Sequence, residues 1–283
     1  MKFGLFVEFG AMNSKPVFDA FATGCKRLGH EVVYNSTDCD VAVIWSVLWH
    51  GRMSRAKTIW DEFKRVNKPV IVLEVGALDR NNLWKVGING INRDATFGPG
   101  GNDSVRANLL GIKLEPWQYK DSGHILICTQ HDKSEQWKGK PSQSTWVLQV
   151  IEHIRSHTDR FIIIRPHPRC PLTGIDHEFP NCRLISPMHV PGTYDDFDFN
   201  VDNVYAVVNY SSNPGIHAVL NGVPAYVGEH SLARPVASDI FGDYNLPQCP
   251  DRQQWLNDYA WTEFSLEEIS QGLPLKRLTS ALI

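Results

Sequence analysis

The stretch from Val204 to Val227, VYAVVNYSSNPGIHAVLNGVPAYV, limits most strongly what this chain can fold into. An apolar run with strand character leads through a polar Ser/Asn turn into a helical segment, and a second apolar run follows Pro224. Pro214 suits the first turn of a helix, and Asn221-Gly222 suits its end. Two strands joined by a helix pair in parallel, so the stretch predicts an α/β fold.

The same alternation runs through the rest of the chain. Apolar runs predict further strands at residues 3–7, 31–34, 41–45, 69–74, 124–128, 161–164 and 182–185. Helical patterns fall between them at 14–28, around Trp60 and Phe63, and at 143–156. These patterns predict two Rossmann-like, doubly wound domains. The Gly- and Asn-rich segment 75–117 is expected to be a long loop.

A Pro-containing polar segment at 114–123 separates the two series of strands and helices. We therefore expect a first domain over 1–118, a second over 119–260, and a C-terminal helical tail over 261–283. Two helices are expected near this end, at 251–260 and 265–271. Trp255, Tyr259 and Trp261 are expected to pack back onto the first domain.

Composition places the chain among ordinary globular proteins. It has 283 residues, of which 42% are hydrophobic and 21% are charged. No apolar run is long enough to span a bilayer, and the start lacks a secretory signal pattern, so a cytoplasmic location is expected. Six cysteines without a CxxC pair indicate reduced thiols rather than disulfides or a zinc site.

Charge is unevenly distributed along the chain. Residues 1–120 hold 16 Lys and Arg against 12 Asp and Glu, whereas the rest of the chain holds 12 against 19. A basic first half favours an anionic partner such as nucleic acid. An ordinary solvated surface explains the imbalance almost equally well.

Polar clusters follow three predicted strands of the second half, at 129–133, 165–169 and 211–213. Ligands of open α/β sheets bind outside the carboxyl ends of the strands. Arg165 and Arg169 alternate with prolines that keep the segment extended, and guanidinium groups bind phosphate oxygens in pairs. The helix predicted to begin near Asn213 adds free N–H groups. Together the clusters predict a diphosphate site.

These residues resemble a known family. RPHPR at 165–169 and SSNPGIHAVLNGVP at 211–224 resemble the donor-binding half of GT-B glycosyltransferases. The likeness covers residues 124–260 and is strongest to capsule-polysaccharide-type transferases and to related phage-encoded enzymes. It implies a nucleotide-sugar donor, with a UDP-sugar expected, no required cofactor and no indicated metal. It implies these donor-binding residues: Gln130, His131, Lys133, Arg165, His167, Arg169, Ser211, Ser212, Asn213, His217 and Glu229.

Two of those residues mark a departure from the family pattern. Many such enzymes bind the donor ribose through a Glu within the loop–helix motif, and His217 stands at the corresponding place here. Glu229, just after the last strand of the motif, could make that contact instead.

The first half offers the catalytic and acceptor-binding candidates. Glu74 ends a predicted strand that is similar in position to the one carrying the catalytic carboxylate in phage-type DNA β-glucosyltransferases, so it leads as general base. Glu8 ends the first predicted strand and is the second candidate. The acceptor- or DNA-binding candidates are Trp49, Arg52, Arg55, Arg93 and Asp103.

The sequence thus predicts an enzyme that transfers a sugar from a nucleotide-sugar to a hydroxyl, with inversion if attack is direct. A hydroxymethylated pyrimidine in phage DNA is the expected acceptor, which would place the protein in the host cytoplasm. A polysaccharide or lipid-linked acceptor is the alternative within this class. An epimerase or a non-catalytic nucleotide-binding protein of the same fold is the alternative outside it.

Overall fold

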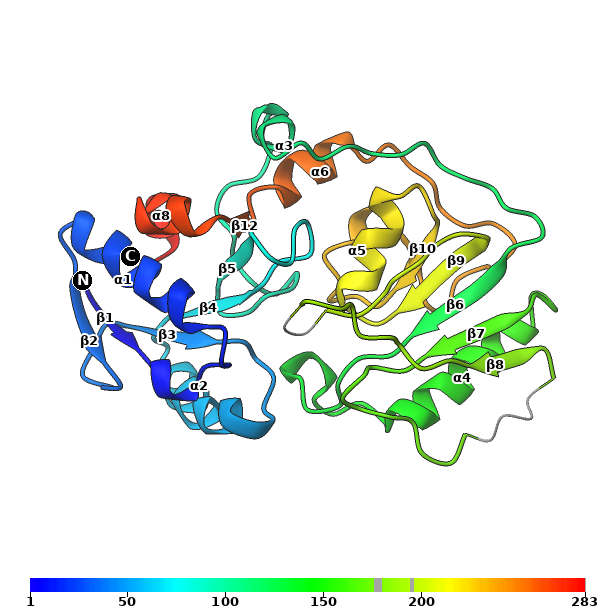
Figure 1. Cartoon of the computed structure of the whole chain (residues 1–283), viewed down its shortest axis with the longest axis horizontal. Coiled ribbons are helices and arrows are strands. Elements are labelled where there is room, and N and C mark those ends of the chain that lie inside the picture. Colours follow the sequence, from blue (N-terminus) through cyan, green and yellow to red (C-terminus); the bar gives the residue numbers. More distant parts are fainter. Residues whose placement is uncertain (176–179, 194–195, 283) are drawn as a thin grey trace. The chain divides into compact units, whose positions relative to one another are not determined.

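The computed structural model describes residues 1–175, 180–193 and 196–282 (Figure 1). The chain forms two compact units: unit 1 combines residues 1–110 with the segment from residue 256 onward, and unit 2 spans Gly111–Trp255. The chain passes between the units after residues 110 and 255, whereas the expected domain boundaries were at 118 and 260. The C-terminal segment is a part of unit 1 rather than a separate tail, because its apolar side chains are buried in that unit's core.

Unit 1 is built on a six-stranded sheet in the order β12-β5-β4-β3-β1-β2. Its strands are β1 (Lys2–Leu5), β2 (Glu31–Tyr34), β3 (Val41–Trp45), β4 (Val70–Val75), β5 (Trp84–Ile88) and β12 (Glu263–Phe264). Its α-helices are α1 (Lys15–Arg27), α2 (Ala56–Arg65), α3 (Val105–Leu109), α7 (Leu266–Ser270) and α8 (Leu273–Leu282). Strands β1 to β4 are parallel, β5 is antiparallel to β4, and β12 is antiparallel to β5.

Two of these elements correct the sequence-based expectation. The segment 75–117 is not one long loop, because it contains β5 and α3. The helix α8 lies in the segment 261–283 that was expected to be helical, beyond the helices expected at 251–260 and 265–271. The strand β5 has Val86 and Ile88 on one buried face, but Gly87 and the Asn/Gly residues after it hide that alternation in the sequence. Pairing with β4 supplies the backbone partners that make the strand stable.

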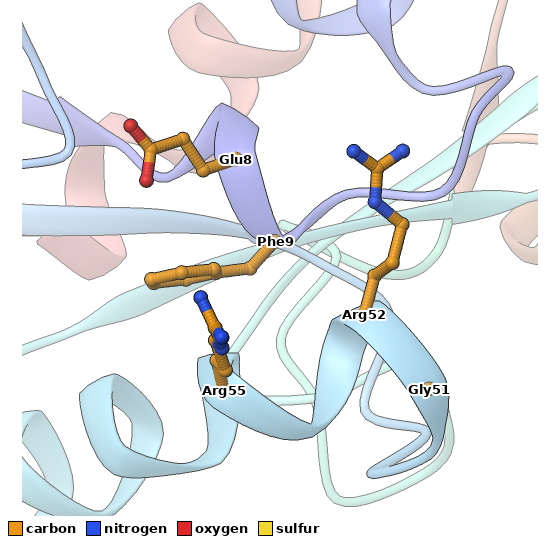
Figure 2. A pocket seen from close by; sticks show the side chains of 5 residues that line it. All are labelled: Glu8, Phe9, Gly51, Arg52 and Arg55. Atoms are coloured by element: carbon orange, nitrogen blue, oxygen red, sulfur yellow. The ribbon is translucent and has the colours of Figure 1, made fainter.

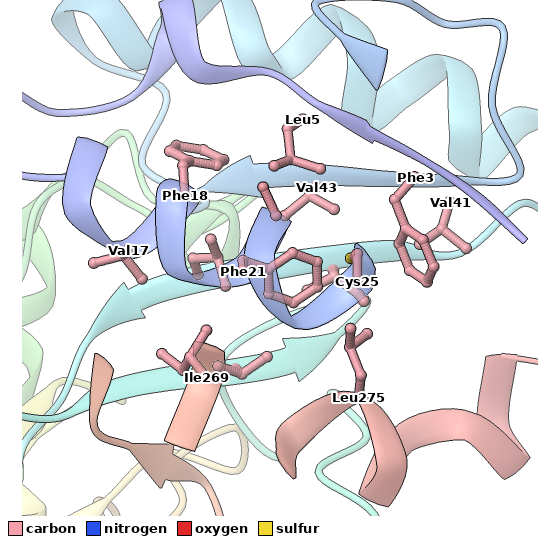
Figure 3. Packing of buried hydrophobic residues seen from close by; sticks show 14 of the residues in the cluster. Phe3, Leu5, Val17, Phe18, Phe21, Cys25, Val41, Val43, Ile269 and Leu275 are labelled. Carbon is pink, nitrogen blue, oxygen red and sulfur yellow. The ribbon is translucent and has the colours of Figure 1, made fainter. Parts of the chain in front are cut away.

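The core of unit 1 explains why the C-terminal helices belong to it. Side chains on one face of the sheet, such as Phe3 and Val43, pack against α1, and Ile269 and Leu275 close the same cluster (Figure 3). The close approach of α1 to α7 needs a glycine, because a Cβ at Gly24 of α1 would lie 2.4 Å from the carbonyl oxygen of Ile269 in α7. The opposite face of the sheet packs against α2.

Unit 2 contains a fully parallel sheet in the order β11-β10-β9-β6-β7-β8. Its strands are β6 (His124–Cys128), β7 (Ile162–Arg165), β8 (Cys182–Leu184), β9 (Val204–Asn209), β10 (Ala225–Val227) and β11 (Ser238–Asp239). Its main helices are α4 (Gln143–Arg155) and α5 (Asn213–Leu220). The stretch 204–227 forms β9, α5 and β10, which confirms the expected strand–helix–strand unit.

The chain leaves unit 2 within α6 (Gln253–Tyr259). Trp255 belongs to unit 2, where its indole N–H donates to the Leu232 carbonyl at 2.8 Å, so the expectation that it packs on the first domain is wrong. Tyr259 and Trp261 do belong to unit 1, where Trp261 packs on the Arg106 guanidinium. All six cysteines are free thiols. In the described part of the chain, no helix has both the length and the apolar character needed to cross a bilayer.

Candidate functional site

Each sheet has one place where the strand order reverses direction, and open α/β sheets bind ligands beyond the carboxyl ends of the strands at that place. In unit 1 the reversal lies between β1 and β3, because β2 is added on one side and β4 on the other. In unit 2 it lies between β6 and β9. The segments that follow these four strands are therefore the first places to look for a site.

The reversal in unit 1 carries a cleft of about 500 Å³. Two short 3₁₀ helices form it: η1 (Val7–Phe9) after β1 and η2 (Gly51–Arg55) after β3. Figure 2 shows Glu8 and Phe9 coming from η1 and the two arginines coming from η2. The lining residues are Glu8, Phe9, Gly51, Arg52 and Arg55. The structure thus brings together three residues that the sequence singled out separately.

The Glu8 carboxylate is held by Asn35, which directly follows β2. The Asn35 amide nitrogen donates to Glu8 Oε1 at 3.1 Å, and its amide oxygen accepts from the Glu8 backbone N–H at 3.4 Å. Asn35 adopts the left-handed conformation, with φ of 51°, which Asn tolerates better than most residues. Asn35 is not among the residues predicted from the sequence, although an Asn placed immediately after a strand was an available signal.

The arginines of the cleft differ from Glu8 in having no such support. Within the residues that the structure describes, neither the Arg52 nor the Arg55 guanidinium makes a hydrogen bond or an ion pair. Both side chains are exposed. The cleft therefore presents two cationic donor groups and one oriented carboxylate.

Glu74, the leading candidate for the base, has different surroundings and does not line the cleft. Its Oε1 accepts from the Val75 N–H at 2.8 Å, and it lies opposite Lys85 in the β4–β5 pair. Lys85 in turn lies opposite the fully buried Glu263 of β12. Burial lowers the pKa of the Lys85 ammonium, while the charges of Glu263 and Glu74 oppose that shift. Glu74 thus belongs to a row of charged residues across the sheet.

The other acceptor candidates are scattered. The Trp49 ring packs on Trp60, with 5.9 Å between centroids. Arg93 is exposed in the loop after β5, and Asp103 accepts from the Val105 N–H at the start of α3. In the described structure, none of these three lines the cleft.

In unit 2 the three polar clusters come together, as the sequence predicts. Gln130 Oε1 accepts from both the backbone N–H and the hydroxyl of Ser211, at 3.1 and 3.0 Å. Gln130 Nε2 donates to the Ser134 hydroxyl at 3.1 Å. The Thr129 hydroxyl accepts from the His167 N–H at 2.9 Å. The loops after β6, β7 and β9 are therefore tied to one another by polar side chains, and Gln130 is used in this framework.

The start of α5 lies in the same region. Ser212 occupies the N-cap position, but its side chain does not bond to the N–H groups of the first turn. It instead accepts from Asn209 Nδ2 at 3.1 Å, and this nitrogen also bonds to the Ser212 carbonyl at 2.8 Å. The Ser212 hydroxyl therefore does not cap this eight-residue helix. Pro214 has no N–H, and the Gly215 N–H donates to the Ser212 carbonyl at 3.4 Å, so the positive end of the helix dipole is the main attraction for an anion here.

The remaining donor candidates of unit 2 have other contacts. Arg165, at the end of β7, donates to the Asp198 carbonyl and lies over the Phe199 ring. The His217 ring also contacts the Phe199 ring, with 5.7 Å between the two ring centroids. Arg169 is exposed, and Glu229 is an exposed partner of Lys140, with 3.8 Å between oxygen and nitrogen.

One group of side chains in the described structure has atoms spaced for a metal ion. The ligand atoms of His131, Asp132 and Cys170 lie within 4.8 Å of one another. Burial raises the pKa of Asp132, but bonds to the Lys133 ammonium and the Cys170 thiol lower it overall. Because Lys133 Nζ lies 3.4 Å from Asp132 Oδ2, the carboxylate already has a cationic partner.

Comparisons with solved structures agree with this architecture. The chain is similar over 98% of its length to the whole of the beta Kdo 2,7 transferase of KpsC from Thermosulfurimonas dismutans, with 16% identity and a TM-score of 0.55. The beta Kdo 2,4 transferase of the same protein matches 93% of this chain and 90% of its own, with 13% identity and a TM-score of 0.49. No protein-family model matches the chain, and no curated protein matches it significantly.

The first of these likenesses shows the fold. Two Rossmann-like units of mixed α/β structure, as found in GT-B proteins, are present here, which confirms the architecture implied by the sequence resemblance. At 16% identity the likeness extends to the fold and no further.

Proposed function

We propose that this chain is a glycosyltransferase that uses a nucleotide-sugar donor, with a UDP-sugar as the expected co-substrate. The strand-order reversal of unit 2 carries the proposal, because three polar loops and the start of α5 meet there. The positive end of the α5 dipole favours a diphosphate at this place. Arg165, Arg169 and the Ser211–Asn213 turn would stabilise the charge that develops on the departing diphosphate.

On the acceptor side, we propose Glu8 rather than Glu74 as the general base. Glu8 lines a cleft that can admit a ligand, and Asn35 orients its carboxylate. Glu74 is committed to the charged row with Lys85 and Glu263. A carboxylate that removes the proton from an attacking hydroxyl supports direct displacement, and direct displacement inverts the anomeric centre.

Two acceptor classes fit a hydroxyl nucleophile: a glycan and a hydroxymethylated pyrimidine in DNA. We favour the glycan. The fold likeness to a Kdo transferase supports it. DNA modification remains the second candidate because of the basic residues in this part of the chain.

The experiment is a donor screen with the full chain. Release of the nucleoside diphosphate is measured for UDP-, GDP- and TDP-sugars, and release of CMP is measured for CMP-sugars. Each donor is tested with acidic glycans, neutral glycans and hydroxymethylated duplex DNA. One donor should give acceptor-dependent release and a glycosylated product by mass spectrometry. Absence of both binding and turnover with every nucleotide-sugar would contradict the proposal.

A further inference from the structure

We infer that the cleft of unit 1 binds an acceptor glycan through an anionic group, a carboxylate or phosphate that lies close to the reacting hydroxyl. The inference rests on the proposed function only in calling this ligand an acceptor. Arg52 and Arg55 of η2 would bind the anionic group, and Glu8 of η1 lines the same cleft.

The two arginines are placed to act on one ligand. They are three residues apart in η2, and a 3₁₀ helix has three residues per turn, so both side chains leave the same side of the helix. In the described structure neither guanidinium has a hydrogen bond or an ion pair, and both line the cleft. A neutral sugar needs no such pair. Planar guanidinium groups instead match the two oxygens of a carboxylate or phosphate.

Glu8 limits what that ligand can be. Asn35 holds its carboxylate at the same cleft, so the site carries two positive groups and one negative group. A ligand with a single anionic group can bind the arginines while its neutral hydroxyl approaches Glu8. A strongly and uniformly charged chain would bring negative charge against Glu8 as well. The arrangement therefore favours one localised anionic group next to a hydroxyl.

The surroundings of the cleft also favour a glycan over the DNA backbone. A nucleic-acid groove needs cationic groups that continue along the strand. Beyond η2, the first basic residue of α2, Lys57, is already paired with Asp61 at 2.5 Å. Lys64 lies over the Trp60 ring at 5.0 Å, and Glu62 adds a further negative charge. Of the basic residues between the start of η2 and the end of α2, Arg52 and Arg55 line the cleft, whereas Arg65 lies at the far end of α2.

Binding without donor nucleotide tests this inference independently of catalysis. Affinity is measured by calorimetry for three probes: an oligosaccharide ending in glucuronic acid, the same oligosaccharide ending in glucose, and a 20-base-pair DNA duplex. The acidic oligosaccharide should bind at least about tenfold more tightly than the neutral one, and the preference should shrink as salt rises. The double variant R52Q/R55Q should lose it.

Arg65→Gln is the matched control, since Arg65 is exposed on α2 and does not line the cleft. This variant should keep the preference for the acidic probe. Equal affinity of the wild type for the acidic and neutral probes overturns the inference, as does a preference that survives in R52Q/R55Q. Tighter binding of DNA than of the acidic probe, lost in R52Q/R55Q, assigns the cleft to nucleic acid instead. A failed donor screen alongside a clear acidic preference would overturn the proposed transfer and leave the anion site standing.

Discussion

Both units have polar groups beyond the strand ends where the strand order reverses, but these groups differ in how far they are hydrogen-bonded to one another. In unit 2 the polar side chains beyond β6, β7 and β9 bond to one another, as Gln130 does with Ser211. Among the described residues that line the unit 1 cleft, Glu8 is bonded to Asn35, whereas the two arginine side chains have no hydrogen bond or ion pair. A site whose groups are already bonded is preorganised for one invariant ligand part, such as a diphosphate. Cations without partners suit recognition of a more variable one.

Among these tests of the difference between the two units, replacing the proposed base should have the largest effect on turnover. Glu8→Gln keeps the shape and removes the proton acceptor, so kcat should fall about 100- to 10,000-fold. Nucleotide affinity should stay near wild type, since unit 2 would bind the donor. Steady-state kinetics and calorimetry check both. Glu74→Gln is the matched control and should retain most of its turnover. The reverse pattern would return the role of base to Glu74.

Unit 1 should depend strongly on its buried carboxylate. Glu263 accepts from the Ala77 N–H at 2.7 Å, the Leu78 N–H at 3.0 Å and the Tyr259 hydroxyl at 2.8 Å. Glu263→Ala leaves these donors and the buried Lys85 without their partner, so the free energy of unfolding should fall by about 3–5 kcal/mol.

Urea denaturation measures this loss of stability. Glu267→Ala, at an exposed position on α7, is the control and should change the unfolding free energy little. A Glu263→Ala protein as stable as wild type would mean that the hydrogen bonds of the Glu263 carboxylate are not needed to hold the C-terminal segment in unit 1.

On the donor side, Arg165→Ala should weaken binding of the nucleoside diphosphate by about 1–3 kcal/mol, the scale of a lost charged hydrogen bond. The chain should remain folded, since the bond from Arg165 to the Asp198 carbonyl is near the surface. Arg183→Ala, at an exposed position in β8, is the control. Unchanged nucleotide affinity in a folded Arg165→Ala protein would remove Arg165 from the donor site.

The smallest expected effect concerns Asn35. Asn35→Ala removes one hydrogen bond to the Glu8 carboxylate, so kcat should fall about three- to tenfold while donor affinity is kept. Asn35→Asp places a second carboxylate beside Glu8, and neighbouring carboxylates hold a proton at higher pH. The acidic limb of the pH–rate profile should therefore move to higher pH in that variant. An unshifted profile would show that Asn35 does not act through Glu8.

The sequence by itself determined the alternation of strands and helices and the position of the polar clusters of unit 2. Both follow from local chemistry: apolar periodicity selects the elements, and the carboxyl ends of parallel strands share one edge. The segment 204–227 is the clearest example, because the strand, the helix start and the second strand each have their own local signal.

Only the tertiary structure decided which carboxylate faces a cleft. Glu8 and Glu74 look alike in sequence, each at or near the end of an apolar run. Antiparallel pairing with β5 places Glu74 opposite Lys85, whereas the neighbouring ends of β1 and β3 place Glu8 beside η2. Contacts such as Asn35 with Glu8, 27 residues apart, depend on strand order. Strand order is fixed by how buried faces pack together, and a local pattern does not encode it.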